Sequence, residues 1–182
     1  MCRVWKYWIR IAVGLSPIAF HRSAMAQQDV TVTDSSFGCI RNGAKVRNTY
    51  IRNADAVRLK EAIRILRDSV PDQEYPIGTF LQLQPREAMV KHARARFPAT
   101  NGWEFFALEV SATGTKIRVR GDSVVNFTGV TCLSCHQPAA KFDFVCEKGH
   151  GCAPIPIDDK QIAALQNADP RCPSTTSPPI KP

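Results

Sequence analysis

A cysteine pair followed at once by a histidine is the part of this sequence best suited to chemistry. Residues 131–136 read TCLSCH, so two residues separate Cys132 from Cys135, and His136 comes directly after them. C-x-x-C-H is the attachment signature of c-type haem. Two sulfurs at this spacing reach two vinyl groups on one edge of the porphyrin, and the histidine that follows becomes an axial ligand. The motif therefore predicts one covalently attached haem c, with Cys132 and Cys135 as thioethers and His136 on the iron.

Three other interpretations use the same cysteines. A thioredoxin-like redox pair would need the motif at the start of a helix in a βαβ unit, and the sequence shows no such unit. A disulfide framework that absorbs all six cysteines after Cys2 would suit an exported domain. A zinc site needs four nitrogen or sulfur ligands, although these spacings match no common zinc module. Its candidate ligands are Cys132, Cys135, Cys146, His150 and Cys152. In the last two cases the protein would be a non-haem binding module.

If haem takes two cysteines, then Cys39, Cys146, Cys152 and Cys172 remain for disulfide bonds. Four cysteines allow three pairings, and the sequence alone does not choose between them. A short helix predicted before Cys172 would bring it back towards Cys152, so Cys39–Cys146 with Cys152–Cys172 is the preferred pairing. Each bond would stabilise the fold by roughly 2–4 kcal/mol.

The first 26 residues have the layout of an export signal. A positive segment precedes the apolar stretch 11–20, and residues 24–26 form an A-x-A cleavage site. A membrane anchor that is never cut is the alternative, but the apolar stretch is short and contains Gly14 and Pro17. The signal predicts a periplasmic or secreted protein, in a compartment where disulfides persist.

Charge and hydropathy bear on the class of partner. The signal contains four basic residues and no acid, so its removal lowers the formal net charge from +8 to +4. That residual charge and the export address argue against a nucleic-acid partner. No stretch after the signal approaches 18 apolar residues, so no membrane span is predicted in the mature chain. The expected partners are a small-molecule ligand or a redox protein, and the sequence leaves open whether the chain forms a homodimer.

The pattern of apolar residues predicts an α+β fold that is mainly β, with one helix flanking an antiparallel sheet. Apolar side chains recur every three or four residues over 53–70, which is typical of a helix packed on a core. Asn53 is the expected N-cap of this helix and Pro71 its stop. Alternating residues predict strands over 79–84 and 116–120. The aromatic-rich stretch 103–110 predicts a strand buried on both faces, and a further strand is expected over 124–127.

Less regular segments surround this core. After the signal peptide, residues 27–52 form a lead-in with a short predicted strand over 29–33. The predicted haem c domain spans 53–157. Residues 158–182 then carry a short helix over 158–167 and a Pro/Ser-rich tail over 174–182, which is expected to be disordered.

The position of the motif separates classes of haem protein. Small electron-carrier cytochromes have the motif near the N-terminus and a methionine ligand downstream, whereas here 46 residues follow His136 and none is methionine. The stretch from YPIGTF (75–80), through MVKHAR and GWEFFALEV, to TCLSCH resembles cytochrome P-460 and its relative cytochrome c′-beta. Those proteins are exported and mostly β, with an antiparallel sheet, a flanking helix and a C-x-x-C-H near the C-terminus. The resemblance covers roughly residues 53–146, and the cysteine-rich extension 144–173 departs from the family.

The resemblance implies a haem whose sixth position is open or weakly occupied. Such a cytochrome handles electrons or binds small ligands such as nitric oxide. The alternative is an enzyme, a haem oxidoreductase that acts on hydroxylamine or nitric oxide. Glu87 and Glu104 are candidate proton acceptors near the iron, although no spacing places either of them there.

Three neighbouring residues are candidates for the rest of the haem site. Cytochrome P-460 bonds a lysine to the porphyrin, and Lys91 is the nearest candidate for this crosslink or for a place at the distal rim. A solvated lysine within a basic run is the alternative. Met89 and His92 flank Lys91 and are the usual strong ligands that the sheet side could supply. We expect neither of them to bind iron permanently.

Overall fold

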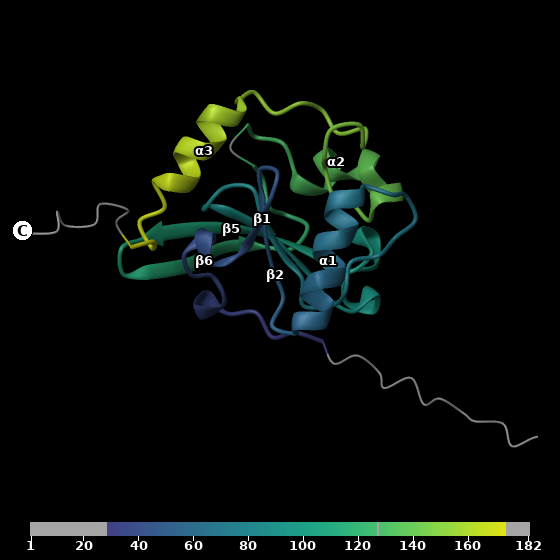
Figure 1. Cartoon of the computed structure of the whole chain (residues 1–182), viewed down its shortest axis with the longest axis horizontal. Coiled ribbons are helices and arrows are strands. Elements are labelled where there is room, and N and C mark those ends of the chain that lie inside the picture. Colours follow the sequence, from purple (N-terminus) through teal and green to yellow (C-terminus); the bar gives the residue numbers. More distant parts are fainter. Residues whose placement is uncertain (1–28, 127, 174–182) are drawn as a thin grey trace, which may run out of the picture.

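The computed structural model describes residues 29–126 and 128–173 and shows a six-stranded antiparallel sheet with few helices (Figure 1). The strands lie side by side in chain order, which makes the sheet a simple meander. They are β1 (Ala44–Val46), β2 (Thr49–Arg52), β3 (Phe80–Gln82), β4 (Glu87–Lys91), β5 (Trp103–Ser111) and β6 (Gly114–Arg120). The α-helices are α1 (Ala56–Asp68), α2 (Cys132–His136) and α3 (Asp159–Asn167). This architecture confirms the mainly-β α+β class. The predicted signal and the predicted tail lie outside the described residues.

Several predicted elements are confirmed and others are wrong. The strands expected over 79–84, 103–110 and 116–120 correspond to β3, β5 and β6. The strand expected over 124–127 is absent from the described part of that segment, where Val125 makes a single bridge to Thr131. The strand expected over 29–33 is also absent, and that segment has no regular secondary structure. The lead-in instead supplies β1 and β2, so the sheet begins before the predicted domain boundary at residue 53.

The helix α1 packs on β1 and β2 and forms part of the main core. Asp55 is its N-cap, in place of the predicted Asn53. The Asp55 carboxylate accepts the backbone N–H groups of Val57 and Arg58 at 2.8 and 3.0 Å, which satisfies two of the free donors at the helix start. Asn53 supports this cap, because its Oδ1 accepts the N–H of Asp55 at 3.0 Å.

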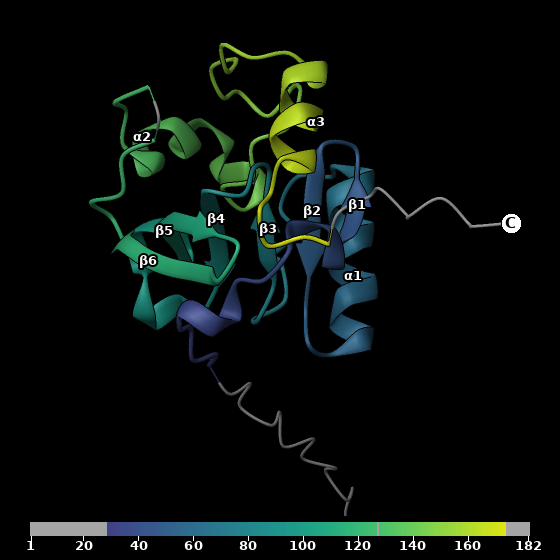
Figure 2. The ribbon, with the colours of Figure 1, turned by 90° about the vertical axis from the view of Figure 1, so that its left-hand side faces the viewer.

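Apolar side chains cover both faces of the sheet. One face carries Leu81, Met89 and Phe105 and packs against α1 and the segment after α2. The other face carries Val90 and Phe106 and is covered by the N-terminal segment. Figure 2 shows α2 and α3 at one end of the sheet and the N-terminal segment below β6. The first face is therefore the one that the C-x-x-C-H motif can reach.

The disulfides join Cys39 to Cys172 and Cys146 to Cys152, so the preferred pairing was wrong. The predicted C-terminal helix is confirmed as α3, but it carries the chain past Cys152 to the N-terminal segment. There the Asp169 carboxylate accepts the N–H of Ile40 at 2.9 Å. In the described part of the chain, no helix is long and apolar enough to cross a membrane.

Candidate functional site

The C-x-x-C-H motif forms its own short helix, α2, beside the sheet. Thr131 caps this helix, because its side chain accepts the N–H of Ser134 at 3.3 Å. The N–H of Cys132 donates to the carbonyl of Val124 at 2.9 Å, which ties the start of α2 to the chain that leaves β6. The helical turn places Cys132, Cys135 and His136 along the same cleft.

His136 is held by a hydrogen bond to the backbone. Its Nδ1 lies 2.6 Å from the carbonyl oxygen of Phe144. Because a carbonyl only accepts, Nδ1 must carry the proton, and Nε2 keeps its lone pair. Burial lowers the pKa of His136 from its ordinary value, although the bond to Phe144 opposes this shift. The imidazole is therefore neutral at pH 7, which is the form that ligates metals.

The cleft lies between α2, the sheet and the segment 152–157, which begins at the Cys146–Cys152 disulfide. Its lining is mostly apolar or sulfur-containing. The sheet contributes Leu81, Glu87, Ala88, Met89 and Phe105, α2 contributes Cys132, Cys135 and His136, and the C-terminal wall contributes Cys152, Ala153, Ile155 and Ile157. The ring of Phe105 lies 5.1 Å from that of His136, centroid to centroid.

Both thiols of the motif are free, whereas the other four described cysteines are bonded. Burial, and after it the nearby charge of Glu87, raises the pKa of the Cys132 thiol to about 12. A redox-active C-x-x-C pair needs the opposite, a thiol pKa lowered towards neutrality. The local chemistry therefore argues against a thioredoxin-like pair.

The donor set fits a c-type haem better than it fits zinc. Two free thiols and an imidazole with an available Nε2 face one apolar cleft, as covalent haem requires. The zinc set proposed from the sequence loses two members, because Cys146 and Cys152 are bonded to each other. The cleft encloses about 160 Å³, less than the roughly 300–1,000 Å³ of a typical small-molecule pocket. Its C-terminal wall, 153–157, lacks regular structure and would have to move outward around a porphyrin.

Comparison with known proteins adds nothing to this geometry. No protein-family model, no curated protein and no solved structure matches the chain. The chemistry of the site therefore has to be argued from its own residues.

Met89, Lys91 and His92 were predicted as candidates for the rest of the haem site, and they lie on β4 or directly after it. Of the three, Met89 alone lines the cleft. Lys91 is buried further along, where its Nζ donates to both oxygens of Asp143 at 2.7 Å and to the carbonyl of Asn101 at 2.6 Å. It is therefore neither a solvated lysine nor a lining residue. His92 lies on the opposite face of the sheet. Its Nδ1 and Nε2 lie 2.9 and 3.0 Å from carboxylate oxygens of Asp29 and Glu104.

The two carboxylates that were predicted as proton acceptors lie on opposite faces of the sheet. Glu87 lines the cleft, whereas Glu104 pairs with Arg120 at 2.5 Å and lies beside His92. Successive side chains of a strand point to opposite faces of the sheet, so Glu87 and Met89 share one face of β4. Glu104 is paired with Val90 and therefore lies on the other face, beside His92. Residue spacing on β4 would have shown this if the segment had been predicted as a strand.

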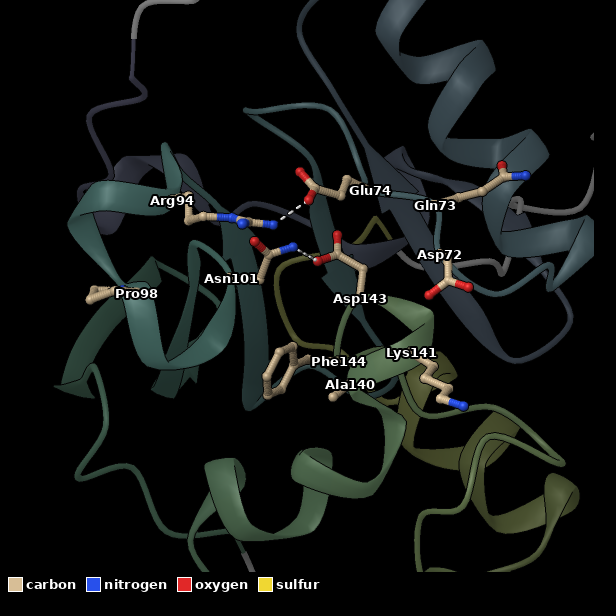
Figure 3. A pocket seen from close by; sticks show the side chains of 10 residues that line it. All are labelled: Asp72, Gln73, Glu74, Arg94, Pro98, Asn101, Ala140, Lys141, Asp143 and Phe144. Atoms are coloured by element: carbon tan, nitrogen blue, oxygen red, sulfur yellow. Dashed lines mark hydrogen bonds and ion pairs between the residues drawn. The ribbon is translucent and has the colours of Figure 1, made fainter.

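A second cavity borders Asp143 and Phe144 (Figure 3), the latter being the residue whose carbonyl is bonded to His136. It measures about 420 Å³ and is lined mostly by polar residues. Asn101 and Asp143 lie side by side in its wall, where the Asn101 amide donates to Asp143 at 2.6 Å. Sequence reasoning missed both residues, because neither belongs to a motif and they come from separate loops.

Proposed function

We propose that the chain is an exported c-type haem protein of the cytochrome P-460 kind. Cys132 and Cys135 bind the porphyrin covalently, and His136 ligates the iron. The observation that carries this proposal is the bond from His136 Nδ1 to the Phe144 carbonyl, beside two free thiols in one cleft. This bond fixes the tautomer in which Nε2 can coordinate iron.

Each part of the cleft has a task in this proposal. Haem supplies reversible one-electron chemistry and a site for a small ligand such as nitric oxide. The Phe144 carbonyl orients His136 and makes it a stronger ligand. The buried side chains of Leu81 and Phe105 exclude water from the inner wall of the cleft, which favours retention of the cofactor. The Cys146–Cys152 disulfide holds the start of the C-terminal wall against α2.

Covalent attachment is the decisive test. The chain is to be expressed in a bacterium that has the haem-attachment machinery, and the mature protein analysed by pyridine haemochrome spectrum and intact mass. We expect one haem per chain, carried by the peptide that contains Cys132 and Cys135. The Cys132→Ser/Cys135→Ser variant should carry none, because neither thioether can form. Ser134→Ala, a change between the two cysteines, should leave attachment intact. A wild-type protein without a Soret band would overturn the proposal.

The sixth position of the iron is expected to be open or water-bound. Met89 is the only strong ligand from the predicted set that lines the cleft, and a buried side chain in a sheet core has little freedom to move. Electron paramagnetic resonance of the ferric protein should therefore give a high-spin signal that changes on addition of cyanide or nitric oxide. A low-spin signal that becomes high-spin in Met89→Ala would contradict this expectation. His92→Ala is the matched control, since His92 lies on the other face of the sheet.

A second candidate function is that of an oxidoreductase that removes electrons from hydroxylamine and passes them to an acceptor. The observation that favours it is Glu87, a carboxylate in the wall of the cleft near Met89 that can accept the protons released from the substrate. Hydroxylamine-dependent reduction of an external electron acceptor measures this activity. We expect Glu87→Gln to lower its kcat at least 100-fold, in line with the usual contribution of a general base of about 10²–10⁴. An unchanged kcat would remove Glu87 from the mechanism.

A further inference from the structure

The orientation of His136 depends on an unusual backbone turn. The carbonyl that receives its Nδ1 proton belongs to Phe144, which follows Asp143. Both residues have positive φ, 52° at Asp143 and 60° at Phe144. Residues with a Cβ rarely adopt this conformation, and two in succession persist only where the surroundings hold them.

The Asp143 carboxylate is the anchor of this turn. It receives the Lys91 ammonium on both oxygens at 2.7 Å, the backbone N–H of Tyr75 at 2.8 Å and the side-chain amide of Asn101 at 2.6 Å. These donors come from the end of β4 and from two separate loops. The side chains of Lys91 and Asp143 are only 4% and 1% exposed. A buried charge pair with this many hydrogen bonds is a rigid point in the fold.

The outer side of the turn faces a cavity, although the Phe144 side chain belongs to the main core. Asp143 and Phe144 border this cavity of about 420 Å³, as Figure 3 shows. Cavity space supplies no van der Waals contacts that could resist a change in backbone conformation. Within the turn, the N–H of Phe144 donates to the carbonyl of Ala139 at 3.0 Å and the N–H of Val145 to that of Phe142 at 3.1 Å. The polar contacts of Asp143 add the restraint that ties the turn to β4 and to the two neighbouring loops.

We infer that Asp143, anchored by Lys91, is a positioning residue for His136. The pair holds the turn so that the Phe144 carbonyl stays on Nδ1, and Nε2 stays unprotonated and directed for coordination. Lys91 then acts on the site through the polypeptide. The relevance of this device to iron rests on the proposed function, but the tautomer of His136 is a property of the chain itself.

The test reads the His136 tautomer directly, without haem. The mature chain carrying Cys132→Ala and Cys135→Ala is labelled with ¹⁵N, and the two ring nitrogens of His136 are followed by NMR. The Nδ1–H form should dominate. Adding Lys91→Met and Asp143→Gly removes both charges together and places glycine, which tolerates positive φ, in the turn. We expect the ratio of Nδ1–H to Nε2–H forms to fall about fivefold, as for the loss of one ordinary hydrogen bond.

A matched control removes a second buried ion pair. Arg171 and Asp169 lie 2.8 Å apart with side chains 3% and 0% exposed. Arg171→Met/Asp169→Asn should leave the His136 tautomer unchanged, because neither residue contacts the turn. If circular dichroism shows the glycine variant to be unfolded, Lys91→Met/Asp143→Asn makes the same comparison. It keeps an acceptor for the Tyr75 N–H, so the expected fall is smaller, about twofold.

A folded variant with an unchanged tautomer ratio would overturn the inference even if haem attaches normally. A fall in the ratio in a chain that never acquires haem would support the inference and remove the proposed function. In the haem protein, the iron–histidine stretching band in resonance Raman should also shift in the Lys91→Met/Asp143→Gly variant, because the proximal hydrogen bond weakens. An unshifted band would overturn the inference for the haem protein.

Discussion

Replacing Lys91 by methionine is expected to lower the free energy of unfolding at pH 7 by about 3–5 kcal/mol. The variant leaves the Asp143 carboxylate buried, with 1% of its side chain exposed and no opposite charge beside it. The donors from Tyr75 and Asn101 remain, but they do not neutralise the charge. Urea denaturation followed by circular dichroism measures the loss.

The pH dependence of this loss separates missing charge from missing packing. Burial raises the pKa of Asp143, and the ammonium of Lys91 opposes that rise. Without Lys91 the pKa rises further, so the folded chain binds a proton that the unfolded chain, with a pKa of about 3.9, releases. The stability of Lys91→Met should therefore fall as the pH rises from 4 to 7. A deficit that is constant over this range would point to lost packing instead.

The double variant Lys91→Met/Asp143→Asn is the control for this prediction. It removes both charges, so no buried charge is left unpaired, and such replacements are often close to neutral. We expect it to recover most of the loss seen in Lys91→Met. A double variant as unstable as the single one would show that the ion pair itself, rather than the unpaired carboxylate, determines stability.

Removing the Cys39–Cys172 disulfide is expected to destabilise the fold by about 5 kcal/mol, against about 2 kcal/mol for Cys146–Cys152. The two bonds close loops with sequence separations of 133 and 6 residues, so they restrict the unfolded chain very differently. Replacing both cysteines of each pair by alanine avoids burying a hydroxyl group. Thermal and urea unfolding of the two double variants provide the comparison.

The ratio of these losses is the informative quantity. Equal losses would mean that local packing, rather than chain entropy, determines what each bond contributes. The bond between Cys146 and Cys152 also lines the cleft beside α2. Its loss should therefore affect the site more than the global stability, whereas loss of the long-range bond should do the reverse.

The parts of the fold that sequence reasoning identified are those with a clear period. The helices α1 and α3 and the strand β6 show one. The exception is β5, which is buried on both faces over its first half and was predicted from its aromatic residues. The strand β4 was missed because it is buried on both faces along most of its length, so apolar and polar residues do not alternate, and, unlike β5, it contains no aromatic residue. The strands β1 and β2 are three and four residues long, too short to show a period.

In the candidate site, too, the local features were predicted from the sequence and the non-local contacts were not. The C-x-x-C-H motif is local, and its three side chains meet in one cleft as its spacing predicts. The partners of Lys91 are not local, because Asn101 and Asp143 lie 10 and 52 residues further along the chain. The same is true of the disulfides, for which the predicted helix before Cys172 was the clue used and led to the wrong pairing. Contacts that depend on how loops fold over the sheet leave no pattern in a single sequence.

The long-range disulfide also affects the order in which the molecule can be completed. Cys39 precedes every other described cysteine, and its partner Cys172 is the last of them. A growing chain therefore presents Cys39 together with Cys132, Cys135, Cys146 and Cys152 before its native partner exists. All six strands lie between the two bonded cysteines, so this bond can form only after every strand of the sheet has been synthesised.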